Sequence, residues 1–149
     1  MPTPTTWLGR HSALGVPLFR LFVGATLVYG TQDNVFSREK MLEFSEFLAT
    51  SGFPAPLFNA HLSAWAQFIC GLLIAAGAAT RPAAAVMAIN FAVALWMVHR
   101  SLPFSANIAP LAMFFGSLLL VFHGAGAYSV DAARQRRAGP AVHPRLSAE

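Results

Sequence analysis

The chain has 149 residues, of which 56% are hydrophobic and only 11% are Asp, Glu, Lys or Arg, whereas about 25% are charged in a typical soluble domain. A soluble protein of this size exposes too much surface for so few charges to cover, so the composition indicates a membrane protein. The net charge of +4 comes from basic residues scattered along the chain, which excludes the basic stripe of a nucleic-acid-binding protein. The single cysteine, Cys70, excludes an internal disulfide and a dithiol pair.

The first apolar stretch runs from about Ala13 to Tyr29 and contains a charge, because Arg20 lies within GVPLFRLFVG. A charged side chain inside a membrane helix is expensive, so Arg20 needs a partner or access to the interface. Two explanations stay open at this point. Arg20 forms a structural ion pair, or it binds an anionic or carbonyl-bearing ligand such as a quinone head or a lipid headgroup.

The long connection from residue 30 to 61 contains SREKMLEFSEFLATSGFPAP. Its apolar residues recur at helical spacing while charged residues take the other side, which predicts an amphipathic helix. Ser37 is placed to cap this helix, and Gly52, Pro54 and Pro56 end it. We expect an interfacial helix that covers the outer mouth of a bundle, and a lid over a ligand pocket is the alternative.

Three further apolar stretches follow, and none of them contains Asp, Glu, Lys or Arg; they are Leu62–Ala79, Ala83–Val98 and Ile108–Phe122. Each is slightly shorter than the roughly 20 residues that span a bilayer, and flanking residues make up the difference in the interface. Pro82 suits the first turn of the third helix, so a tight hairpin is expected at Thr80–Pro82. The prediction is an all-α integral membrane protein with a four-transmembrane-helix bundle, and an amphipathic interfacial helix between its first two helices.

Four crossings place both termini and the 80–82 turn on one side of the membrane. That side carries more basic residues than the other, namely Arg10, Arg81, Arg134, Arg136, Arg137 and Arg145 against Arg38, Lys40 and Arg100. The positive-inside rule therefore predicts cytoplasmic termini. We divide the chain into a cytoplasmic N-terminal segment (1–12), a membrane domain (13–130) and a polar cytoplasmic tail (131–149) that begins as a short helix.

No acidic residue falls inside the second, third or fourth apolar stretch, so Arg20 has no ion-pair partner there. Asp131 follows the fourth stretch on the same side as the start of the first, within GAGAYSVDAAR. An arginine can extend its charged head part of the way to the interface. We therefore predict an ion pair between Arg20 and Asp131 near the cytoplasmic interface.

Other polar residues give a second set of candidates. Gln67 and Asn90 lie well inside the second and third helices, where they either bond between helices or contact a ligand. Tyr29, His61 and His99 lie near the outer helix ends and are expected to converge there with Asp33. Their spacing is not that of a metal or haem site, so no metal is predicted.

Several segments together resemble the DoxX family of small four-helix bacterial inner-membrane proteins. They are FRLFVGATLVYG, LATSGFPAP, GLLIAAGAATRPAA and GAGAYSVDA. The family takes its name from the membrane subunits of a thiosulfate:quinone oxidoreductase, so the resemblance implies a quinone-facing or anchoring role beside a partner oxidoreductase. Gln67 and Asn107 stand where family members often carry acidic residues, which argues against a proton-coupled activity and leaves the scaffold intact.

The predicted function is thus a membrane subunit or anchor of an oxidoreductase complex, not catalytic alone, with quinone as the expected ligand. Candidate ligand contacts are Arg20, Gln67, Asn90, Tyr29, His61 and His99. The expected partners are membrane lipid, an oxidoreductase and further copies of the chain. One alternative is an assembly protein that recruits a soluble partner through the basic segment ARQRR. Another is a small-molecule permease, which would need oligomers.

Overall fold

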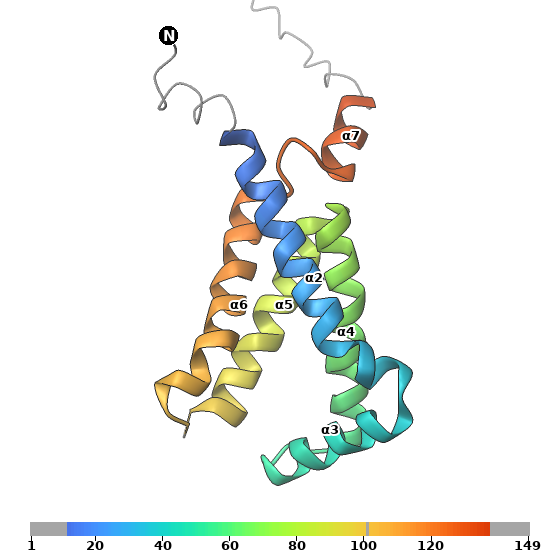
Figure 1. Cartoon of the computed structure of the whole chain (residues 1–149), viewed down its shortest axis with the longest axis vertical. Coiled ribbons are helices and arrows are strands. Elements are labelled where there is room, and N and C mark those ends of the chain that lie inside the picture. The colour runs from blue at the N-terminus through green and yellow to red at the C-terminus, as the bar shows by residue number, and fades with distance from the viewer. Residues whose placement is uncertain (1–11, 101, 138–149) are drawn as a thin grey trace, which may run out of the picture.

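The structure is a computed structural model that describes residues 12–100 and 102–137. Four helical segments in this part of the chain are long and apolar enough to cross a membrane: Ser12–Phe36, Pro56–Ala76, Thr80–His99 and Phe104–His123. The first comprises the short η1 (Ser12–Leu14) and α2 (Gly15–Phe36), and the third comprises α5 (Thr80–Ala94) and a π-helical turn, η2 (Leu95–His99). The described residues form no strand. The predicted all-α, four-helix membrane bundle is confirmed (Figure 1).

The bundle is built from two closely packed pairs, α2 with α4 (Pro56–Ala76) and α5 with α6 (Phe104–His123). Small residues allow α2 and α4 to approach, since a Cβ on Gly24 would lie only 2.5 Å from the carbonyl oxygen of Gly71. Apolar side chains from all four spans meet in a buried core that includes Val23, Ile74 and Met87. The core therefore lies along the bundle axis, and many large apolar side chains on the outside remain exposed to lipid.

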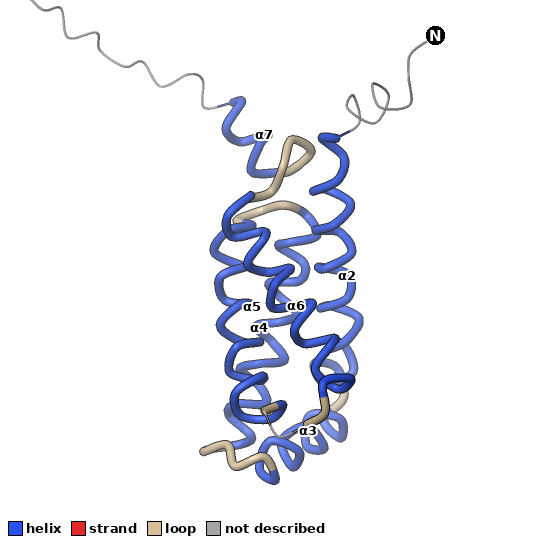
Figure 2. Tube along the Cα trace, turned by 90° about the vertical axis from the view of Figure 1, so that its left-hand side faces the viewer, coloured by secondary structure: helices blue, strands red, loops and turns tan. Residues whose placement is uncertain are grey.

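The amphipathic helix is present as α3 (Arg38–Thr50) and lies across one end of the bundle, as Figures 1 and 2 show. Its N-terminus is capped by Ser37, whose hydroxyl accepts from the Lys40 N–H at 3.4 Å. It buries Met41, Ser45 and Leu48 and packs on α4 and α2. This end of the bundle is called the α3 end below, and the opposite end, where α2 begins and α6 ends, is called the termini end.

All four spans are longer than the apolar stretches predicted, and the bounds of α2 and α4 differ most. α2 continues to Phe36 rather than ending near Tyr29, because its polar last turns still satisfy their groups within the helix; the Thr31 hydroxyl donates to the Leu27 carbonyl at 2.7 Å. α4 begins at Pro56 rather than Leu62, since proline at the first helical position loses no intrahelical hydrogen bond. The hairpin between α4 and α5 is tight, as expected, but its turn lies at residues 77–79, and Thr80–Pro82, which were expected to form it, are the first turn of α5.

The polar tail begins as a short helix, α7 (Val130–Arg137), which lies at the termini end, with the α6–α7 connection between it and the start of α2 (Figure 2). This agrees with the helix expected there. The rest of the predicted tail, residues 138–149, and nearly all of the predicted N-terminal segment 1–12 lie outside the described residues.

Candidate functional site

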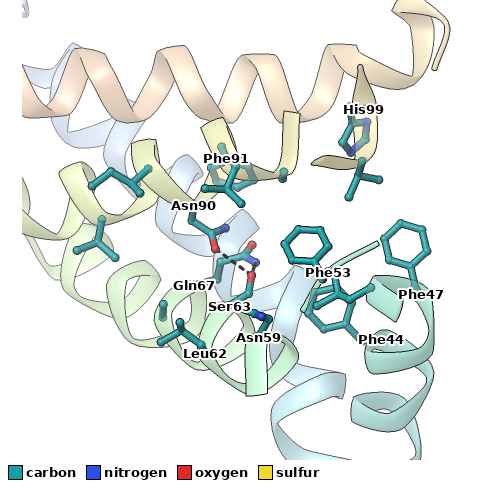
Figure 3. A pocket seen from close by; sticks show the side chains of 17 residues that line it. Phe44, Phe47, Phe53, Asn59, Leu62, Ser63, Gln67, Asn90, Phe91 and His99 are labelled. Atoms are coloured by element: carbon teal, nitrogen blue, oxygen red, sulfur yellow. Dashed lines mark hydrogen bonds between the residues drawn. The ribbon is translucent and has the colours of Figure 1, made fainter. Parts of the chain in front are cut away.

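A cavity of about 420 Å³ opens at the α3 end between α3, α4 and the α5–η2 helix. Its walls are mainly apolar and aromatic, and its polar side chains gather on α4 and α5 (Figure 3). Sites for small molecules typically have about 300–1,000 Å³ and combine apolar walls with a few convergent polar groups. This cavity has that size and that character.

Ser63, Gln67 and Asn90 form the polar cluster of the cavity (Figure 3). The Ser63 hydroxyl donates to Asn90 Oδ1 at 2.9 Å and accepts from Gln67 Nε2 at 3.1 Å. Among the described residues, neither Asn90 Nδ2 nor Gln67 Oε1 has a hydrogen-bond partner. The cluster therefore holds the two amides in place and leaves donors and an acceptor available to a ligand.

Aromatic side chains of α3 and the following turn complete the wall; Figure 3 shows Phe44, Phe47 and Phe53 to one side of the polar cluster. The turn fixes Phe53, whose N–H donates to the Leu48 carbonyl at 3.0 Å while Gly52 adopts φ +82°. This is the glycine-dependent arrangement that commonly ends helices. α3 thus acts as one wall of the pocket, which agrees with the alternative of a helix over a ligand site.

His99 is the last residue of η2 and lines the same cavity. Its Nδ1 atom is buried and has no hydrogen-bond partner in the described chain. A π-helical turn often marks a functional position, because the extra residue redirects the side chains that follow it. The cavity therefore contains one imidazole beside three neutral amides, those of Asn59, Gln67 and Asn90.

The predicted convergence of Tyr29, His61 and His99 is wrong. Tyr29 is 78% exposed on the outside of α2, two residues from the buried Leu27. His61 lies in a separate groove with Asn34 and Trp65, and its Nδ1 is 2.9 Å from the Leu57 carbonyl. A step of two residues turns a helix by about 200°. Tyr29 therefore points away from the face of α2 that carries Leu27, and His61 points away from the face of α4 that carries Ser63.

Three of the six candidate contacts, Gln67, Asn90 and His99, lie together in the cavity, and Arg20, Tyr29 and His61 lie outside it. Ser63 was missed, although it precedes Gln67 by four residues and so shares its helix face. The phenylalanines of α3 were assigned to the amphipathic face but not to a ligand site. Among the described residues, no group of three or more His, Cys, Asp and Glu side chains could hold a metal ion.

Arg20 lies at the termini end, where its side chain is only 7% exposed. Its guanidinium donates to the main-chain carbonyl of Tyr128 and lies directly over Gly77, where an added Cβ would be 1.5 Å from Nη1. The direct ion pair predicted with Asp131 is not formed among the described residues, where a salt bridge joins only Lys40 and Glu43.

Asp131 has other hydrogen-bond partners, which explains why it forms no direct ion pair with Arg20. Its carboxylate accepts from the N–H groups of Ala79 and Thr80 at 2.8 and 3.0 Å, and its own N–H donates to the Gly77 carbonyl at 2.9 Å. Burial alone would raise the pKa of Asp131, but these backbone hydrogen bonds and the nearby Arg134 lower it overall. Asp131 therefore caps the N-terminus of α5 and holds α7 against the α4–α5 turn.

These features define a multi-pass membrane protein with a four-helix bundle and a lateral cavity under an interfacial helix. The family model for DoxX matches residues 15–100, more than half of the chain, and the chain belongs to the DoxX family. The matched region runs from α2 to η2 and so contains every residue that lines the cavity. Comparisons with curated proteins and with solved structures found no match.

Proposed function

We propose that this protein is a membrane subunit of an oxidoreductase complex and that the cavity at the α3 end binds the head of a lipid-soluble quinone. The observation that carries the proposal is the pair of amides, Gln67 and Asn90, fixed by Ser63 in an otherwise apolar cavity. A quinone head has the matching character, since it is a flat apolar ring with carbonyl oxygens that accept hydrogen bonds.

The amides suit a neutral ligand better than charged side chains would. An amide N–H can donate to a quinone carbonyl, and it carries a far smaller desolvation cost than a charge in an apolar surrounding. Phe44 and Phe53 offer aromatic faces and edges to the ring. His99 adds a ring nitrogen without a hydrogen-bond partner among the described residues at the wall of the cavity.

A bound quinone would supply the redox chemistry of such a site, and the bundle would bind and orient it. The chain has one cysteine, too few to ligate an iron–sulfur cluster on its own. We therefore propose that a partner oxidoreductase delivers the electrons and that this protein anchors the partner to the membrane. The support for this part is the family relationship, whose name derives from membrane subunits of a thiosulfate:quinone oxidoreductase.

We also propose a location in the bacterial inner membrane with both termini in the cytoplasm and α3 on the outer face. The excess of arginine at the termini end supports this orientation. A membrane-impermeant maleimide tests it on intact cells. Glu46→Cys, on α3, should be labelled, and Gln135→Cys, on α7, should be labelled only after the cells are opened.

Binding of a short-chain quinone to the protein in mild detergent tests the ligand. Asn90→Ala and Gln67→Ala should each weaken binding about two- to ten-fold, which corresponds to one net hydrogen bond. Asn34→Ala is the matched control, because Asn34 is an amide at the same end but lies in the groove of His61. Equal affinity in all four proteins, or no binding to the wild type, would overturn the proposal.

A further inference from the structure

A second cavity, of about 680 Å³, lies at the termini end between the start of α5, the end of α6 and α7. Unlike the cavity at the α3 end, it is lined by basic side chains, which are Arg81, His123 and Arg134. Asp131 also borders it. The two cavities have different chemistry, and the elements that line them, α3 for the first and α7 for the second, lie at opposite ends of the bundle (Figure 1).

The charge of this second cavity is not balanced by the protein. The carboxylate of Asp131 already accepts two main-chain N–H groups. Arg81 has a long hydrogen bond of 3.4 Å to the Phe122 carbonyl, and Arg134 forms no salt bridge with any described residue. Two arginines therefore face the cavity against one carboxylate, which leaves an excess of positive charge there.

The backbone around the cavity holds Arg81 in place. Gly124 has φ +84°, and a Cβ there would lie 3.2 Å from Arg81 Nε. The glycine thus lets the α6–α7 connection pass close to the guanidinium, which explains part of the GAGAYS segment. The Arg81 head is in this way held at the mouth of the cavity while its remaining N–H groups stay available.

The position along the bundle identifies the kind of anion. Two candidate membrane spans, Thr80–His99 and Phe104–His123, have an end at this cavity, so it lies at the height of lipid headgroups. Phe122 and Tyr128, which are next in sequence to the lining residues His123 and Ala127, are 79% and 62% exposed. A free phosphate would not use this apolar surface, whereas acyl chains of a phospholipid would cover it.

We propose that this cavity binds the phosphate headgroup of an anionic membrane phospholipid, with Arg81 and Arg134 as its charged contacts and His123 at its edge. Arginine forms strong, charge-assisted hydrogen bonds with phosphate, and basic pockets between membrane helices are known to hold anionic headgroups. The bound lipid would bridge α5, α6 and α7. This proposal does not depend on the quinone site, and an experiment that disproves one of the two sites leaves the other unaffected.

Thermal unfolding of the whole protein in a neutral detergent tests the proposal. Short-chain phosphatidylglycerol, phosphatidylcholine and inorganic phosphate are titrated separately, and the apparent affinity is read from the rise in Tm. Phosphatidylglycerol should stabilise the wild type at lower concentration than the other two. Arg81→Gln and Arg134→Gln should each weaken its binding about five-fold. Arg38→Gln, which changes the exposed first residue of α3, should leave it unchanged.

Three results would overturn the proposal. Phosphatidylcholine as effective as phosphatidylglycerol would show that no headgroup charge is recognised. Inorganic phosphate as effective as the lipid would show a site for free anions. An equal loss in Arg38→Gln would show a general effect of net charge. Arg134→Gln keeps the test informative if Arg81→Gln fails to fold, because the Arg134 side chain is exposed and forms no hydrogen bond with described residues.

Discussion

Polar side chains have different kinds of hydrogen-bond partners at the two ends of the bundle. At the termini end, the charged Arg20 and Asp131 bond to main-chain groups of Tyr128, Ala79 and Thr80, and the buried Nε and Nη1 atoms of Arg20 have no hydrogen-bond partner among the described residues. At the α3 end, the neutral amides of Gln67 and Asn90 retain unused hydrogen-bonding atoms in an open cavity. The comparison teaches that the conspicuous charge in the first membrane helix closes the fold, while the less conspicuous amides form the candidate ligand site.

The largest effect on stability is expected for a substitution at the termini end, at the position where an added side-chain atom has the least space. Gly77 and Gly52 both follow a helix with positive φ, +69° and +82°, and only Gly77 has Arg20 against it. Alanine at either position strains the backbone by about 1–2 kcal/mol, and Gly77→Ala adds a steric cost of about 1–3 kcal/mol. Thermal unfolding followed by circular dichroism should therefore show a clearly larger fall in Tm for Gly77→Ala. Equal falls would show that Arg20 does not pack on Gly77.

Loss of a helix cap should also cost more at the termini end. Asp131→Ala removes both acceptors at the start of α5 and should destabilise the protein by about 0.5–2 kcal/mol. Ser37→Ala removes a single, longer bond at the start of α3 and should cost less. Denaturant titration of both variants measures the difference. A greater loss in Ser37→Ala would contradict the role assigned to Asp131.

Acid should weaken the termini end through Asp131. The folded-state pKa of Asp131 is lowered, mainly because the Thr80 and Ala79 hydrogen bonds outweigh burial. Its contribution to stability is therefore present above the unfolded-state pKa of about 3.9 and is lost as the pH falls through the lower folded value. In wild type, Tm should fall in this range more than in Asp131→Asn. Identical pH profiles would exclude this linkage.

The smallest effect on stability is expected at the α3 end. Ser63→Ala removes the hydroxyl that links Gln67 to Asn90, and hydrogen bonds between membrane helices contribute about 0.6 kcal/mol on average. Stability should change little, whereas quinone affinity should fall a few-fold because the amides lose their fixed orientation. Thr26→Ala is the control, since its hydroxyl bonds only to its own helix at an exposed position. A large loss of stability without loss of affinity would make the cluster structural.

Helices and their periodicity could be predicted from the sequence because those signals are local. The four apolar stretches predicted the membrane spans, and the alternation around Met41 and Leu48 predicted α3. Side-chain direction was harder, since a shift of two residues sends His61 to a different groove from Ser63. The hydrogen bonds of Asp131 join residues 51 and 52 positions apart in the sequence, and that of Arg20 joins residues 108 positions apart. Because such contacts depend on the tertiary fold, the sequence alone did not show that Arg20 and Asp131 bond to main-chain groups instead of to each other.

Photo-crosslinking with an azido-quinone, followed by mass spectrometry of the labelled peptides, tests the difference between the two ends most directly. The account predicts labels in 44–53, 59–67 and 86–99, the segments that line the cavity at the α3 end. An excess of unlabelled quinone should remove these labels. Label concentrated around Arg20, Gly77 and α7, or spread evenly over the lipid-facing surface and not displaced, would contradict it.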